Sequence, residues 1–105
     1  MTNWKPYNSG NVVNAEGDKI LRDEIKSVIA RVTIKQGPQY ISVSCSIPGW
    51  IEHTRFFKEL PDAEREYEMM KEDLGKIVNV ITSTNDQLKV WEMISLFVRR
   101  FEQSL

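Results

Sequence analysis

The sequence predicts an α+β fold, with an antiparallel β-sheet of three to five strands in the N-terminal half and two C-terminal α-helices packed on one face of the sheet. From residue 28 to residue 58, apolar and polar side chains largely alternate, which is the period that half-buried strands show. After Pro61, apolar residues recur at steps of three and four, as they do along one side of a helix. Strands followed by helices are typical of a sheet that helices cover on one face.

Residues 1–105 are expected to form a single domain, because a chain of this length can bury one core and no segment resembles a linker. The first predicted element is a short hairpin with its turn at Glu16-Gly17, which places Val13 opposite Ile20. The pattern leaves open whether residues 1–10 dock on the domain or form a mobile arm.

A second hairpin joins residues 28–35 to residues 40–47 through a loop at residues 36–39. Each segment places its apolar residues on one side and its polar residues on the other. Closing the loop at four residues brings every apolar side chain opposite another on one face. The predicted pairs are Ile34 with Ile41, Val32 with Val43, and Ala30 with Cys45.

A third strand, residues 50–58, follows a turn at Pro48-Gly49, and its register stays open between two alternatives. A two-residue connection directs one set of side chains to the core, and a connection one residue longer directs the other set. The first set is Trp50, Glu52, Thr54 and Phe56, and the second is Ile51, His53, Arg55 and Phe57.

The first helix is predicted from Pro61, which suits a first helical position. Within its apolar stripe, Gly75 predicts a close approach to another backbone. The stripe consists of Ala63, Tyr67, Met70, Leu74, Ile77, Val78 and Ile81.

The second helix is predicted to start at a capping box, Thr84-Asn85-Asp86-Gln87, with Thr84 as the N-cap. Its apolar arc is wider than contact with one sheet face requires, and it is rich in aromatic residues that suit interface centres. Five residues of this arc are predicted to form an interface with a protein partner or with a second copy of the chain, and the alternative is that the first helix covers the extra apolar surface. They are Trp91, Ile94, Phe97, Val98 and Phe101.

Composition restricts the classes of function. The single cysteine cannot form an internal disulfide, which favours the cytoplasm. Fourteen Lys and Arg against fifteen Asp and Glu give a formal charge of −1, without the basic excess expected of a protein that binds nucleic acid. No apolar run approaches the ~20 residues needed to cross a bilayer, so no membrane association is expected.

Cys45 and His53 are the only candidates for catalysis. In the longer-loop register they are cross-strand neighbours, but both then point into the apolar face, where burial disfavours the thiolate. A buried cysteine that acts as a small apolar residue is the favoured interpretation. No metal site and no cofactor are predicted, because zinc requires three or four ligands and no glycine-rich nucleotide motif is present.

The other face of the predicted sheet is polar and rich in hydroxyl groups. Its residues are Arg31, Thr33, Lys35, Tyr40, Ser42 and Ser44. A solvent-exposed sheet face explains this pattern, and binding of single-stranded nucleic acid is the alternative.

Taken together, these features of the sequence favour a small cytoplasmic, non-enzymatic protein-interaction module. A Cys45-dependent enzyme or redox-responsive protein and a nucleic-acid-binding protein are kept as alternatives.

Overall fold

A computed structural model of the chain describes residues 4–8, 12–13, 18–27, 29–83 and 85–101, and it confirms the α+β fold class. The strands are β1 (Lys5–Asn8), β2 (Val12–Val13), β3 (Lys19–Lys26), β4 (Ala30–Gln36), β5 (Ile41–Ile47) and β6 (Ile51–Phe57). They form one antiparallel sheet in the order β1-β3-β4-β5-β6, and β2 also pairs with β3. The helices are α1 (Leu60–Ser83) and α2 (Gln87–Arg100).

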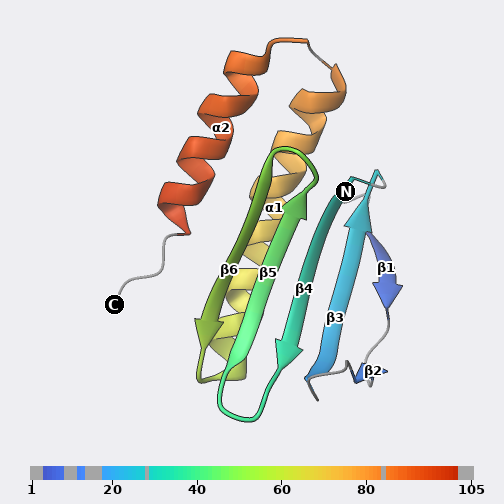
Figure 1. The fold of residues 1–105 in the computed structure, drawn as a ribbon, viewed down its shortest axis with the longest axis vertical. Coiled ribbons are helices and arrows are strands. Elements are labelled where there is room, and N and C mark those ends of the chain that lie inside the picture. The colour runs from blue at the N-terminus through green and yellow to red at the C-terminus, as the bar shows by residue number, and fades with distance from the viewer. Residues whose placement is uncertain (1–3, 9–11, 14–17, 28, 84, 102–105) are drawn as a thin grey trace.

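Both helices lie on the same side of the sheet (Figure 1). Helix α1 packs across β4, β5 and β6, and α2 returns antiparallel to α1 and contacts it. In Figure 1, α2 lies beside the β6 edge of the sheet. The opposite face of the sheet carries no helix in the described part of the chain.

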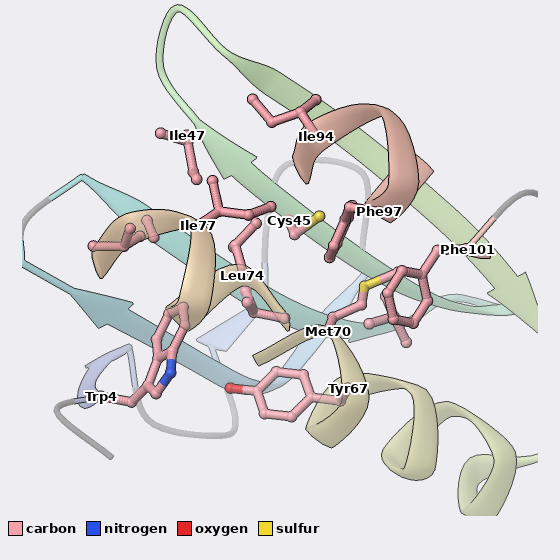
Figure 2. Close-up of a cluster of buried hydrophobic side chains, with 14 of the residues drawn as sticks. Trp4, Cys45, Ile47, Tyr67, Met70, Leu74, Ile77, Ile94, Phe97 and Phe101 are labelled. Atoms are coloured by element: carbon pink, nitrogen blue, oxygen red, sulfur yellow. The ribbon is translucent and has the colours of Figure 1, made fainter. Parts of the chain in front are cut away.

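The core lies between the sheet and the two helices (Figure 2). It contains Cys45 and Ile47 from β5, and Phe97 of α2 and Phe101, which follows the helix, reach it from the side. Burying one large apolar side chain stabilises a fold by roughly 1.5–3 kcal/mol, so this cluster supplies the main driving force for folding. Its most completely buried large apolar members are Ile34, Ile47, Tyr67, Met70, Leu74, Ile77 and Phe101.

The β4–β5 hairpin was predicted, but the predicted register is wrong by two residues. Val32 pairs with Cys45, and Ile34 pairs with Val43. The loop comprises residues 37–40, because the Gly37 N–H donates to the Tyr40 carbonyl at 2.9 Å. A Cβ at position 37 would lie 2.9 Å from an Asp18 side-chain oxygen, so a larger residue here would displace the Asp18 side chain. A shift of two residues leaves every side chain on its predicted face.

The third strand adopts the longer-loop register. Ile47 pairs with Ile51, and Cys45 pairs with His53. Gly49 has a φ of +82°, which glycine adopts without strain, and the Trp50 N–H closes the turn on the Ile47 carbonyl at 2.9 Å. The β6 side chains directed to the helices are therefore the Ile51 and His53 set.

The N-terminal hairpin forms with a register one residue away from the predicted one, because Val12, instead of Val13, lies opposite Ile20. The predicted turn at Glu16-Gly17 lies outside the described residues. Residues 5–8 add a strand to β3, and Trp4 is only 9% exposed. In the described part of the chain, residues 4–8 therefore lie against the sheet.

The predicted apolar stripe of α1 is confirmed, because its residues are buried or half-buried. The contact predicted for Gly75 is different. Gly75 lies against the side chains of Lys26 and Trp4, with the Lys26 Nζ 3.3 Å from where a Cβ on Gly75 would lie. The close approach is therefore made by side chains, and the predicted approach of a backbone is wrong.

The start of α2 also differs from the prediction. The N-cap is Asp86, whose Oδ1 accepts a hydrogen bond from the Lys89 backbone N–H at 3.2 Å. The predicted capping box from Thr84 is therefore wrong, and Thr84 itself lies outside the described residues. An aspartate three residues before the bonded amide is an equally good N-cap, so the spacing alone did not decide between the two positions.

Candidate functional site

Helix α2 has two apolar sides. Val90, Ile94, Phe97 and Phe101 are buried against α1 and the sheet. On the other side, Leu88 is 74% exposed, Trp91 51% and Val98 38%. These three residues and Ser95 recur at steps of three and four, so they lie along one line on the helix. We call Leu88, Trp91, Ser95 and Val98 the outer stripe.

Contacts with the rest of the chain fix α2 in position. His53 Nε2 donates a hydrogen bond of 2.7 Å to the carbonyl of Phe101, just after the helix. Arg100 forms an ion pair of 2.8 Å with Asp73 on α1. These contacts and the Asp86 cap hold both ends of the helix, so the outer stripe is presented on a preorganised element.

One member of the outer stripe also contacts the sheet. The Trp91 ring meets the Trp50 ring edge to face, with a distance of 5.4 Å between ring centroids. Trp50 belongs to the turn between β5 and β6, so the Trp91 ring is oriented by a neighbour although about half of its surface is exposed.

The structure divides the predicted interface residues into two groups. Trp91 and Val98 are exposed, whereas Ile94, Phe97 and Phe101 belong to the core of the same chain. The sequence analysis did not include Leu88, although its spacing of three residues from Trp91 is a helical signal. It also did not separate the two sides of the arc, because periodicity cannot show which side meets the sheet.

Two charged residues flank the outer stripe on one side. Glu92 and Arg99 are both exposed and lie two helical turns apart. In the described part of the chain neither of them forms an ion pair. Among the residues that the structure describes, nothing neutralises these two charges, so they are available to groups outside the chain.

Leu96 is 63% exposed but lies on a different side of α2. It borders a depression of about 200 Å³ between the two helices, together with Ile77 and Met93. Leu96 is thus an exposed leucine of the same helix that does not belong to the outer stripe.

The β6 edge of the sheet is less suited to docking. Arg55 points toward the helices and forms an ion pair with Glu66 of α1. A charge directed inward from an edge strand discourages pairing with another strand. Apolar docking is therefore better supported on α2 than on the neighbouring strand edge.

The structure brings Cys45 and His53 together as a cross-strand pair. Cys45 is almost completely buried, and burial raises the pKa of its thiol to about 12, although a hydrogen bond involving the His53 backbone acts in the opposite direction. The His53 ring contacts Phe97 and the Phe101 carbonyl. This environment disfavours formation of a thiolate and gives the imidazole a structural partner.

The face of the sheet that no helix covers in the described part of the chain contains an ion pair between Arg31 and Asp23. Asp23 is 2% exposed and accepts two hydrogen bonds from Arg31, at 2.8 and 2.6 Å, and one from Thr33 at 3.0 Å. The bonds to Asp23 raise the pKa of the Arg31 guanidinium above its usual value, and the same group stacks on Tyr7 at 4.6 Å. Arg31 is therefore engaged within the chain.

Part of the predicted sheet-face set lines a shallow depression of about 200 Å³. Lys35 and Ser44 line it together with Glu52 of β6, so cationic and anionic groups are mixed. Ser42 is half-buried, and Tyr40 is exposed but belongs to the β4–β5 loop. A mixed and nearly flat surface offers no concentrated positive charge for phosphate groups.

A third polar cluster lies between β3 and α1. Glu24 accepts hydrogen bonds from Tyr67 at 2.7 Å, from Lys71 at 3.0 Å and from Arg22 at 3.1 Å. The Arg22 guanidinium lies over the Tyr67 ring, 4.3 Å from its centroid. Every charge in this cluster has an opposite charge beside it, so the cluster serves to attach the helix to the sheet.

Metal ligands and membrane-spanning segments were also sought in the described residues. No group of three or more His, Cys, Asp or Glu side chains is arranged to hold a metal ion there. Neither α1 nor α2 has the length and the apolar character that crossing a bilayer requires. Comparison of the chain with protein families, curated proteins and solved structures finds no match.

Proposed function

We propose that the protein is a non-enzymatic protein-interaction module, and that the outer stripe of α2 is its docking surface. The observation that supports this proposal is the exposure of Leu88, Trp91 and Val98 in one line on a helix that is held at both ends. Exposed apolar residues that are contiguous mark interaction sites more often than scattered ones. Tryptophan in particular is enriched among the residues that dominate binding energy.

The alternative functions have weaker support. A Cys45-dependent activity needs an accessible thiolate, and the Cys45 thiol is buried with a raised pKa. Nucleic-acid binding through the sheet face needs free cations, and Arg31 is bound to Asp23.

We place the module in the cytoplasm because a free cysteine and the lack of an internal disulfide suit a reducing compartment.

Site-specific photo-crosslinking in living cells tests the proposal. A photoreactive amino acid placed at Leu88 or Val98 should yield protein adducts, whereas the same group at Glu72, on the exposed side of α1, should not. Adding Leu88→Glu to the Val98 probe should abolish its adducts. Leu96→Glu is the matched control, because it makes the same change at an exposed leucine of the same helix.

Two results would count against this function. Adducts at Glu72 that equal those at Val98 would show that the outer stripe has no special affinity. Complete absence of adducts at Leu88 and Val98 would show that nothing docks on it.

A further inference from the structure

We infer that the partner of the outer stripe is a second copy of this chain, with the two α2 helices antiparallel and crossing near Ser95. This inference rests on the proposed function of the outer stripe. A two-fold contact requires a surface that is complementary to itself. The outer stripe and the two charges beside it meet that requirement.

The middle of the outer stripe suits a helix crossing. Ser95 is the small member of the stripe, and larger apolar side chains lie on both sides of it, Trp91 one turn before and Val98 one turn after. Helices pack about 8–10 Å apart depending on the side chains at the point of contact. A small residue there allows a close approach, and Trp91 of each copy can then cover apolar surface of the other.

The charges beside the stripe determine the relative direction of the helices. Along a helix that rises about 1.5 Å per residue, Glu92 lies about 4.5 Å before Ser95 and Arg99 lies about 6 Å after it. A two-fold axis at Ser95 reverses the second helix, so Arg99 of the second copy lies within about 1.5 Å of the level of Glu92 in the first.

The same two-fold symmetry also places the charged sides of the two helices next to each other. Glu92 and Arg99 lie on the same flank of the outer stripe. An axis perpendicular to both helices places that flank on the same side in both copies. Two equivalent Glu92–Arg99 pairs therefore form, one at each end of the crossing.

A parallel arrangement of the helices is disfavoured. A two-fold axis that runs along the helices would put the charged flank on opposite sides of the contact in the two copies, so neither Glu92 nor Arg99 would face an opposite charge of the other copy. An unrelated partner would have no need for Glu92 and Arg99 at similar distances on either side of Ser95. The symmetric spacing is therefore the feature that favours a second copy.

The test combines the solution mass with charge reversal. Light scattering on the wild-type chain, from micromolar to millimolar concentration, should show the mass approach that of two chains. Glu92→Arg and Arg99→Glu should each weaken the dimer by about tenfold or more, because each creates two like-charge contacts. Both residues are exposed and unpaired in the described part of the chain, so circular dichroism should show unchanged folding.

The decisive sample is an equimolar mixture of the two variants. In the antiparallel arrangement, the arginine introduced at position 92 of one variant faces the glutamate introduced at position 99 of the other. The native Arg99 of the first variant then faces the native Glu92 of the second. The mixture should therefore regain wild-type affinity as a heterodimer. Lys89→Glu, which reverses a charge on another side of α2, should leave the dimer unchanged.

Three results would overturn the inference: a wild-type monomer at all concentrations, a dimer that neither reversal weakens, or a mixture that stays monomeric. If the chain is monomeric but crosslinks from Leu88 reach another protein, the interaction function stands and only the second copy is excluded. If it is monomeric and crosslinks to nothing, both proposals fail.

Discussion

Cys45 shows how burial decides the chemistry of a residue. The pairing of Cys45 with His53 could resemble a nucleophile and a base, but the thiol lies under α1 and α2 with its pKa raised from 9.0 to about 12. At pH 8 such a shift lowers the thiolate fraction about 1000-fold. Reaction with a thiol reagent in the native state should therefore be at least that much slower than in urea.

The measurement is the rate of labelling at pH 8 with and without denaturant. The native rate should also follow the rate of unfolding, because the thiol is covered. A labelling rate in the native state close to that of the unfolded chain would show that Cys45 is a reactive group.

Glu24 is the residue through which stability should respond most clearly to acid. Burial by itself would raise the pKa of Glu24, but hydrogen bonds from Tyr67 and Lys71 and the charges of Lys71 and Arg22 hold it below 4.5. A carboxyl group with a lower pKa in the folded state stabilises the fold above its unfolded pKa. This contribution is lost as the pH falls through the folded value.

Glu24→Gln should therefore lower the free energy of unfolding by about 2 kcal/mol at pH 7, and the difference from the wild type should shrink below pH 4.5. Urea titrations between pH 3 and pH 7 measure both quantities. Glu72→Gln, at an exposed position on α1, is the control. A difference that does not change with pH would contradict the assigned role of the Glu24 charge.

At the scale of the elements, periodicity was sufficient to predict the type of the elements from residue 19 onward and the buried side of α1 and β5, whereas β1 was not predicted as a strand. Periodicity could not predict the registers, because these depend on the conformation and the contacts of the loops. Gly37 lies close to the Asp18 side chain, a contact across 19 positions that no local pattern reveals. The pairing of Cys45 with His53 depends instead on the conformation of the local turn at Gly49, for which the sequence allowed two loop lengths.

The candidate site was only partly predictable for a related reason. The wide arc of α2 indicated that the helix had more apolar surface than one contact needs, and Trp91 and Val98 are indeed exposed. Which residues are exposed depends on the angle at which α2 meets α1. That angle is set by contacts such as His53 with Phe101, which join positions 48 residues apart in the sequence.

The N-cap of α2, Asp86, is expected to stabilise the helix. Asp86→Ala removes the acceptor for the Lys89 backbone N–H and should lower the free energy of unfolding by about 1 kcal/mol. Asn85→Ala is the matched control at the adjacent exposed position, and it should stay within about 0.5 kcal/mol of the wild type. Urea denaturation compares the two variants. An equal loss in both would show that Asp86 is not the cap.

On the scale of the whole molecule, the core joins the N-terminal strand to the end of α2. The cluster of buried apolar residues runs from Trp4 to Phe101 and includes residues from the sheet and from both helices. A continuous core of this kind favours cooperative unfolding of the chain as one domain. It also allows α2 to present its outer stripe without moving relative to the sheet.

Fluorescence of single tryptophans tests whether α2 is part of that cooperative unit. Trp4 reports on β1 and α1, whereas Trp91 reports on α2. In two variants that each retain one of these residues and carry Phe in place of the other tryptophans, the urea transitions should coincide with each other and with the circular dichroism signal of the same variant. An earlier transition at Trp91 would show that α2 separates before the sheet unfolds, and the outer stripe would then not be a preorganised docking surface.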